Sequence, residues 1–304
     1  MRIGVTGASG MLGTALIDEL ANKYKVFATA RSKGLEKDGI IWECFELTNF
    51  QHLNKWLEMT DPDMVIHCAA IVDVDKCEDN VDYVTKLHVD STKAIVNYLN
   101  RNNKKLIYIS TDSVFDGKSD RPYVESDTVN PLNIYSKTKL LGEKSVLLMN
   151  GGLVLRTNII GWSTSGNISF AEWLLNGLIE SKPLSLFSDV IFSPLNVSDL
   201  SKIITQAIDS EITGLYHCTS KDYLSKYDFG IKIAKIFNFS IDNIKKISVD
   251  NVNLKASRPK NIALNSKKLS LILGCDFPVA LDAIKLMKVQ YDDGWLSRIK
   301  RVKL

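Results

Sequence analysis

The stretch "TGASGMLG", Thr6–Gly13, decides the fold of this chain, because its three glycines are spaced three residues apart. The apolar run Ile3–Val5 precedes it and reads as a buried strand, and apolar residues recur at helical spacing over Met11–Leu20. A strand, a glycine turn and a helix in this order are typical of a dinucleotide-binding unit. On this stretch alone, a helix that merely begins with glycines stays the alternative.

The three glycines have distinct expected roles. Gly7 allows a tight bend, Gly10 lets backbone amides approach a pyrophosphate, and Gly13 lets the helix lie close on the sheet. The free N–H groups at the start of the helix would then face the anion. The stretch therefore predicts a site for the phosphates of a dinucleotide cofactor.

The rest of the N-terminal half alternates between strands and helices. The expected strands are Tyr24–Arg31, Gly39–Leu47, Asp63–Ala70, Lys105–Thr111 and Gly152–Asn158. The expected helices are Asn49–Met59, Val81–Asn102 and Ile134–Met149. Regular alternation with helix-length connections predicts an α/β fold with a doubly wound parallel sheet of the Rossmann type. Ligands of such sheets bind at the carboxyl ends of the strands.

The alternation fades after Asn158. The expected helices there are Ser169–Ser181, Val197–Asp209 and Ser225–Phe237, the last with Ser225 and Asp228 spaced as a capping box. Short extended pieces, Leu184–Ser188 and Gly214–Ser220, lie between them. We therefore expect a cofactor domain over residues 1–158, which also receives about 195–210. Residues 159–304 would form mostly a smaller mixed α/β substrate lobe.

Composition excludes several classes of protein. The 304 residues carry a net charge of only +3 with scattered lysines, so we expect no nucleic-acid partner, and the basic run Arg298–Lys303 reads as a solvated tail. Five cysteines, an odd number without short paired spacing, argue against a disulfide framework and a zinc site, and we expect no metal. The chain shows no signal-peptide pattern and no membrane-spanning apolar stretch. These features predict a cytoplasmic protein.

The end of the second expected strand indicates the cofactor. An NAD-binding unit carries an acidic residue there, whereas "ATARSKG" carries Arg31 and Lys33 and no acid. The segment therefore predicts NADP(H), with Arg31 at the 2′-phosphate. Glu46 and Leu47 end the third strand where an adenine ring would lie, and the backbone of Cys68–Ala70 would run beside the cofactor.

Candidate catalytic residues lie in "STDSVFDG" and "YSKTK". Tyr135 and Lys139 are four residues apart on an expected helix and share a face, and Thr111 ends the fifth strand. A lysine beside a tyrosine favours the phenolate, and a threonine hydroxyl can fix a substrate carbonyl. Together they predict hydride transfer to a ketone with Tyr135 as general acid. His67 and His88 read as ordinary strand and helix residues.

Four motifs together, "TGASGMLG", "STDSVFDG", "YSKTKLLGE" and "SRPKNIALNSKKL", resemble the extended short-chain dehydrogenase/reductase superfamily. Within it they are similar to the dTDP-4-dehydrorhamnose reductase family, from Arg2 to about Met287. The resemblance implies a Rossmann domain with a C-terminal substrate lobe and the catalytic triad Thr111, Tyr135 and Lys139. It also implies NADPH-dependent reduction of the C4 ketone of a nucleotide-linked 4-keto-6-deoxyhexose, with dTDP-4-dehydrorhamnose as the expected substrate.

The same resemblance implies contacts for each ligand. The residues implied at the cofactor, besides Tyr135 and Lys139, are Gly7, Gly10, Met11, Leu12, Ala69, Ala70 and Val72. The residues implied at the nucleotide sugar are Lys76, Asp112, Ser113, Phe115, Asn158 and Arg258.

Two positions depart from the family pattern. Ser113 stands where relatives commonly have tyrosine, and Ile159 stands where they have tryptophan; both would face the sugar, so the hexose stays open. Ser113 also stands where related 4,6-dehydratases place a glutamate base, and a serine cannot serve as that base. Two alternatives remain: a non-catalytic NADP(H)-binding regulatory subunit of another enzyme, and an epimerase/reductase of the same superfamily. The superfamily also suggests a homodimer through the helices Ile134–Met149 and Val81–Asn102.

Overall fold

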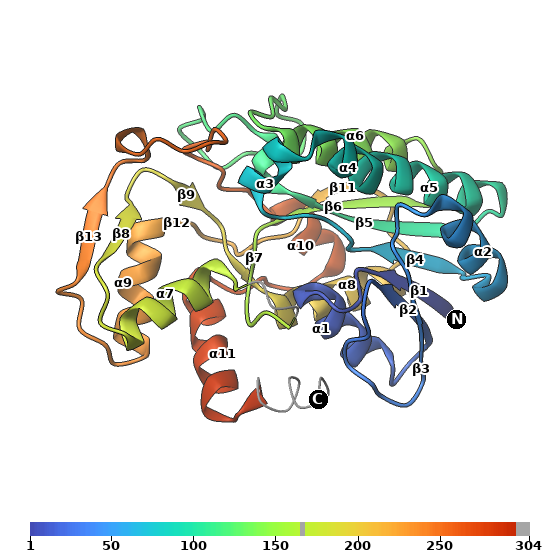
Figure 1. Ribbon diagram of the computed structural model, residues 1–304, viewed down its shortest axis with the longest axis horizontal. Helices are drawn as coiled ribbons and strands as arrows, with labels where there is room; N and C mark the ends of the chain where they lie inside the picture. The colour runs from blue at the N-terminus through green and yellow to red at the C-terminus, as the bar shows by residue number, and fades with distance from the viewer. Residues whose placement is uncertain (165–167, 296–304) are drawn as a thin grey trace.

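The computed structural model describes residues 1–164 and 168–295 (Figure 1). The basic run Arg298–Lys303 lies outside the described residues. Among the described helices, none is long and apolar enough to cross a membrane.

The centre of the molecule is a parallel sheet of seven strands in the order β11-β6-β5-β4-β1-β2-β3. Its strands are β1 (Arg2–Thr6), β2 (Lys25–Ala30), β3 (Ile40–Cys44), β4 (Met64–His67), β5 (Lys105–Thr111), β6 (Gly152–Thr157) and β11 (Gly214–His217). The order reverses between β1 and β4, as in a doubly wound dinucleotide-binding sheet. The predicted Rossmann-type fold class is therefore confirmed.

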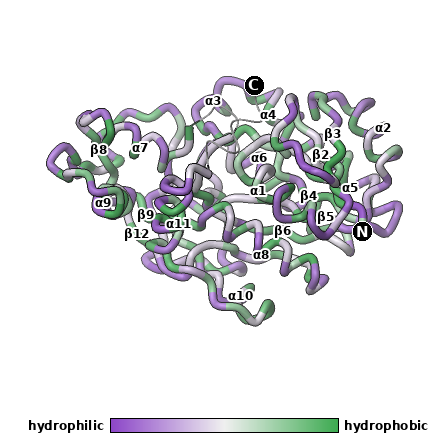
Figure 2. Tube along the Cα trace, turned by 90° about the horizontal axis from the view of Figure 1, so that it is seen from below, coloured by the Kyte–Doolittle hydropathy of each residue, from purple (hydrophilic) through white to green (hydrophobic). Residues whose placement is uncertain are grey.

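Helices cover both faces of this sheet (Figure 1). One face packs against α1 (Met11–Leu20) and α8 (Val197–Asp209), and the other against α2 (Phe50–Thr60), α5 (Ser91–Arg101) and α6 (Ile134–Leu147). Val65 and Ile66 are neighbours on β4 and fully buried, yet they belong to the cores on opposite faces. Burial on both faces explains why these strands read as continuous apolar runs rather than alternating ones. Figure 2 shows this hydrophobic concentration along β4, β5 and β6.

The expected helix Val81–Asn102 is continuous but not regular. It consists of α4 (Val81–Thr85), one π-helical turn over Lys86–Asp90, and α5. A short α3 (Val74–Asp79) precedes it. Single π-turns inside α-helices occur frequently at functional sites, and this one carries His88.

A second core lies beside the sheet and holds the smaller lobe together (Figure 1). Its helices are α7 (Phe170–Ile179), α9 (Lys226–Ile236) and α11 (Ala280–Asp292). Its strands form three short pairs, β8 (Leu184–Phe187) with β13 (Ile244–Ile247), β9 (Ile191–Phe192) with β12 (Leu224–Ser225), and β7 (Ile159–Ile160) with β10 (Leu195–Asn196). Phe192 and Phe229 are fully buried in this core.

Two segments differ from the sequence-based expectation. The piece Gly214–Ser220 does not belong to the smaller lobe, because its strand β11 pairs with β6, and Tyr216 and Cys218 pack in the main core beside α8 and α10 (Lys267–Leu273). A long insertion between β6 and α8 hides this last strand–helix–strand unit in the sequence. The capping box of α9 forms only in part: Ser225 Oγ accepts a bond from the Asp228 N–H, but the Asp228 carboxylate accepts from Ser225 Oγ rather than from the backbone.

Candidate active site

The glycine turn, Gly7–Gly13, is packed against the loop that follows β4. Gly7 has a φ of +65°, and a Cβ there would lie 2.7 Å from the Ala69 nitrogen. A Cβ on Gly13 would lie 2.3 Å from the Gly7 carbonyl oxygen. Neither position tolerates a side chain, so the start of α1 is held close to the carboxyl ends of β1 and β4. No described side chain caps α1 at Gly10, which leaves first-turn N–H groups available to an anion.

The other residues implied at the cofactor differ in exposure. Leu12 and Cys68 turn their side chains towards the main core, so only their backbones can face a ligand. Met11 and Ala70 are half-buried at the surface of the turn and loop. Val72 is 67% exposed, which makes it the most accessible of the set.

Arg31 follows β2 directly and is exposed. In the described part of the chain it forms no ion pair, and its charge acts on Tyr83, whose hydroxyl donates to Glu46 at 2.9 Å. The structure thus gathers Arg31, Tyr83 and Glu46 at the ends of β2 and β3. Leu47 is buried in the core under α2.

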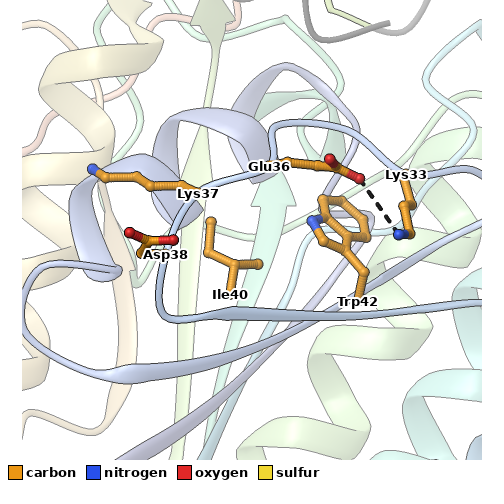
Figure 3. A pocket seen from close by; sticks show the side chains of 6 residues that line it. All are labelled: Lys33, Glu36, Lys37, Asp38, Ile40 and Trp42. Carbon is orange, nitrogen blue, oxygen red and sulfur yellow. Dashed lines mark ion pairs between the residues drawn. The ribbon is translucent and has the colours of Figure 1, made fainter.

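Lys33 does not share the contacts of Arg31. It pairs with Glu36 at 3.4 Å and lines a pocket of about 430 Å³ (Figure 3). The lining residues are Lys33, Glu36, Lys37, Asp38, Ile40 and Trp42. The pocket lies at edge strand β3, and β2, β1 and β4 separate that strand from β5. It is therefore distinct from the place where the candidate catalytic residues meet.

Thr111, Tyr135 and Lys139 come together at the end of β5. The α6 helix begins at Asn133, whose side chain accepts from the Ser136 N–H at 2.9 Å, and this cap places Tyr135 in the first turn. The Tyr135 phenol lies close enough to the Thr111 hydroxyl for that hydroxyl to act on its pKa. One turn further along α6, the Lys139 ammonium donates to the Ile109 carbonyl at 2.6 Å.

Burial dominates the electrostatics of this group. It raises the pKa of the Tyr135 phenol above its usual value, with Thr111 opposing and Asp112 adding to the rise. Burial also lowers the pKa of Lys139 to about 7, against the opposing charge of Glu143. The direction at Tyr135 is opposite to the expected lowering by Lys139, because burial outweighs the other contributions. The Lys139 ammonium itself is directed at a backbone carbonyl and at the Tyr108 ring, 4.0 Å away. The phenol consequently keeps its proton at neutral pH.

Glu143 continues the face of α6 that carries Tyr135 and Lys139. Its carboxylate pairs with Arg156 of β6 at 2.7 Å and accepts from Ser110 Oγ at 2.5 Å. The side chains of Glu143 and Arg156 are only 1% and 4% exposed. This buried pair lies behind Lys139 and was not predicted, although the repeated spacing of four residues in "YSKTKLLGE" points to it.

His88 connects the loop after β4 to α6. Its Nε2 lies 2.9 Å from the Ile71 backbone nitrogen and must accept that N–H, so Nδ1 carries the proton and donates to Thr138 Oγ1 at 2.9 Å. Burial lowers the pKa of His88 to about 2, which keeps the ring neutral. The ring meets the Tyr135 ring edge-on at 6.0 Å. His88 therefore links this loop to α6 and packs beside Tyr135.

Asp112 is the centre of the residues on the substrate side. It is 2% exposed and accepts from Asn158 Nδ2 at 2.5 Å, from Thr111 Oγ1 at 3.1 Å and from Ser113 Oγ at 3.2 Å. Burial raises the pKa of its carboxyl, while these three bonds oppose the rise. The structure thus brings three of the residues implied at the nucleotide sugar next to the candidate catalytic threonine.

The other three residues implied at the nucleotide sugar have contacts of their own and form no bond with Asp112 in the described part of the chain. Phe115 has no exposed surface and stacks on Tyr123 at 4.1 Å, so it supports the core rather than a ligand. Lys76 is paired with Asp73 at 3.2 Å. Arg258 is paired with Asp75 at 3.1 Å, which ties the segment around Arg258 to α3.

This fold, with a threonine, tyrosine and lysine meeting at the carboxyl end of β5, defines an extended short-chain dehydrogenase/reductase. Within this class, the chain belongs to the family of the RmlD substrate binding domain, whose model matches residues 1–290. The family predicted from the four motifs is therefore confirmed.

Named relatives agree with this placement. A dTDP-4-dehydrorhamnose reductase from Clostridium acetobutylicum has a similar structure, with a TM-score of 0.84, 28% identity, and coverage of 96% of this chain and 100% of that chain. A dTDP-4-dehydrorhamnose reductase from Bacillus anthracis in complex with NADP has a TM-score of 0.84 and 27% identity, and the match covers 95% of this chain and 99% of that chain. The probable low-salt glycan biosynthesis reductase of Haloferax volcanii is 27% identical over 95% of this chain and 98% of its own length. Methionine adenosyltransferase 2 subunit beta of Rattus norvegicus is 31% identical over 89% of this chain and 82% of its own length.

Proposed function

We propose that this protein is an NADPH-dependent reductase of nucleotide-linked sugar ketones. Its expected substrate is the C4 ketone of a 4-keto-6-deoxyhexose, with dTDP-4-dehydrorhamnose as the first candidate. The observation that carries this proposal is the meeting of Thr111 and the Tyr135 phenol at the carboxyl end of β5, with Lys139 one helical turn further along α6 and held by the Ile109 carbonyl. The names of the similar solved structures, two of them dTDP-4-dehydrorhamnose reductases, support the same reaction.

The chain's own atoms fit NADP(H). The uncapped first turn of α1 offers N–H groups to the diphosphate, and the close approach of Gly7 to Ala69 leaves the backbone there without side-chain obstruction. Arg31 offers an exposed guanidinium to a 2′-phosphate, where an NAD-binding unit would carry an acid. NADPH supplies the hydride when it is bound.

Tyr135 supplies the proton. The substrate carbonyl oxygen would lie within hydrogen-bond reach of both the Thr111 and Tyr135 hydroxyl groups. As the carbonyl carbon accepts the hydride, its oxygen accepts the phenol proton, and the ketone becomes a secondary alcohol. Solvent then returns a proton to the phenolate that remains. Ser113 offers no base for the removal of a ring proton, so reduction and not dehydration follows.

The test is a panel of keto-sugar nucleotides offered to the purified protein with NADPH. We expect NADPH absorbance to fall with dTDP-4-dehydrorhamnose, and NMR of the product to show a 4-hydroxy sugar. Altered stereochemistry at another ring carbon would instead indicate an epimerase/reductase. A panel in which no ketone is reduced would contradict the proposal.

The second candidate is a non-catalytic NADP(H)-binding subunit of another enzyme. The specific observation in its favour is the 31% identity to methionine adenosyltransferase 2 subunit beta, over 82% of that protein. Such a subunit would bind NADPH without consuming it in the presence of any keto sugar. Turnover therefore separates the two candidates.

A further inference from the structure

Tyr135 lies in the part of its helix that is held least firmly by the helix itself. α6 begins at Ile134, so Tyr135 is its second residue. The N–H groups of a first turn have no carbonyl partner within the helix, and helix ends fray where nothing else accepts these bonds. The cap Asn133 supplies one acceptor, for the Ser136 N–H at 2.9 Å. The position of the phenol therefore depends on what else holds this turn.

A second acceptor for the first turn comes from a distant segment. Glu78, on α3, lies 56 residues before Ile134, and its Oε1 accepts from the Ile134 N–H at 2.9 Å. A carboxylate at this end of a helix also interacts favourably with the helix dipole, and such charge-assisted bonds are about twice as strong as neutral ones. Among the described residues, the ion pairs around α3 involve Asp73, Asp75 and Asp79 but not Glu78. No cation therefore competes with the Ile134 N–H for this carboxylate.

The helix that carries Glu78 is itself held in place. Asp75, on the same short helix, accepts from the Ala256 N–H at 3.0 Å and pairs with Arg258 at 3.1 Å. The segment around Arg258 thus fixes α3 from the other side. Glu78 consequently gives the first turn of α6 a fixed support rather than a movable one.

A second tie holds α6 beyond Tyr135. His88 accepts from the Ile71 N–H and donates to Thr138 Oγ1, each at 2.9 Å. Ile134 precedes Tyr135 by one residue, and Thr138 follows it by three. The bonds from Glu78 and His88 therefore hold α6 on both sides of the tyrosine to the chain that follows β4.

We propose that Glu78 is a positioning residue, which holds the first turn of α6 and with it the Tyr135 phenol at the end of β5. This inference rests on the proposed reductase function. Glu78 acts through Tyr135, because its bond to the backbone fixes the residue next to the tyrosine and leaves the proton donor itself unchanged.

The test measures kcat, KM and NADPH binding of the wild type, Glu78→Ala and Glu78→Gln, with the ketone that the wild type reduces. We expect Glu78→Ala to lower kcat by about 10-fold to 100-fold, because small misplacements of a catalytic group have effects of this size. KM and NADPH binding should change little, since only the proton donor moves. Glu78→Gln keeps an oxygen that can accept the Ile134 N–H, so it should restore most of kcat.

A double-mutant cycle separates positioning from a general structural role. Once Tyr135→Phe has removed the phenol hydroxyl, a residue that acts only through this group has nothing left to affect. Glu78→Ala should therefore lower the residual rate of Tyr135→Phe by less than about 2-fold. Asp82→Ala is the control, because it removes an exposed carboxylate from the first turn of the next helix, α4, and should leave both rates unchanged.

Two outcomes would overturn the inference and leave the reductase function standing. One is an equal fold-loss from Glu78→Ala in the wild type and in Tyr135→Phe. The other is a loss of kcat in Glu78→Gln as large as that in Glu78→Ala. If Glu78→Ala unfolds at a much lower temperature than the wild type, Glu78→Asp takes its place in the cycle, because it keeps the charge on a side chain one methylene shorter. If the wild type reduces no ketone, the proposed function fails and this inference fails with it.

Discussion

At the glycine turn the contacts are made by backbone atoms of one short stretch, whereas around Asp112 they are made by side chains from distant segments. Gly7 and Gly13 belong to eight consecutive residues, Thr6–Gly13, and act through the absence of a Cβ. Asp112 and Asn158 are 46 residues apart and act through a carboxylate and an amide. The difference teaches that the cofactor side depends on local backbone shape, while the substrate side depends on which strand ends the sheet brings together and where buried charges find partners.

The largest effect is expected at the buried pair behind Lys139. Glu143→Ala leaves the Arg156 guanidinium buried without its partner, and breaking a buried pair from one side typically costs about 3–5 kcal/mol. The free energy of unfolding in urea measures the loss. The matched control is Glu180→Ala, which breaks an exposed pair with Lys182 and should cost only about 0–1 kcal/mol. Similar losses of stability in both variants would show that burial does not make the Glu143–Arg156 pair more important than an exposed pair.

Acid should destabilise the protein through its buried histidines. Burial lowers the pKa of His67 to about 3, of His88 to about 2 and of His217 to about 3. Below their usual pKa of about 6.5 these rings bind protons only in the unfolded chain, so stability is lost as the pH falls from about 6.5 towards 3. Each ring contributes a slope of up to about 1.4 kcal/mol per pH unit.

Histidine ring signals in two-dimensional NMR check this pH dependence directly. We expect the three rings to remain neutral at pH 5, with His88 as the Nδ1–H tautomer that its two bonds require. Titration of the His88 ring near pH 6.5 would contradict its place between the loop after β4 and α6.

Gly7→Ala tests whether the cofactor side depends on backbone shape. The new Cβ would lie 2.7 Å from the Ala69 nitrogen at a φ of +65°, so we expect a loss of about 2–4 kcal/mol from strain and overlap together. Gly274→Ala is the matched control, because its φ is +62° with nothing within 4 Å of the added Cβ. The difference between the two variants isolates the crowding at the turn. If both lose the same stability in urea, close approach to Ala69 is not the reason for the glycine.

The smallest expected effect concerns the cofactor's 2′-phosphate. Arg31→Ala should weaken NADPH binding by about 1.5–3 kcal/mol, the range for a hydrogen bond to a charged group, and leave NADH binding nearly unchanged. Titration calorimetry with each cofactor measures both values. Lys33→Ala is the control, since Lys33 is paired with Glu36 and should affect neither cofactor. Equal losses for NADPH and NADH in Arg31→Ala would refute the assignment.

What could be predicted from the sequence follows the same division. Local patterns predicted the parallel sheet, the glycine turn and the shared helix face of Tyr135 and Lys139, because neighbouring residues determine each of them. They did not predict the place of β11, since a long insertion separates its unit from β6. The contacts of His88 were not predicted either, because His88 lies on a π-turn.

Three expectations stay predictions. These are the division into a cofactor domain and a substrate lobe with their ligands, the cytoplasmic location, and the homodimer. Of the helix pair expected at the dimer contact, α5 and α6, the second presents Leu141 and Leu147 at its surface, and the exposed Leu148 follows it. Light scattering over a range of concentrations measures the molar mass and so distinguishes a monomer from a homodimer.

The central claim is that Tyr135 donates the proton to a sugar-nucleotide ketone. The most direct measurement is NADPH consumption with dTDP-4-dehydrorhamnose by the wild type and by Tyr135→Phe, together with NADPH binding by both. Removal of a positioned general acid typically costs about 10²–10⁴-fold in rate, so Tyr135→Phe should lose turnover by that factor while it binds NADPH as the wild type does. Equal turnover by the two proteins would contradict the account.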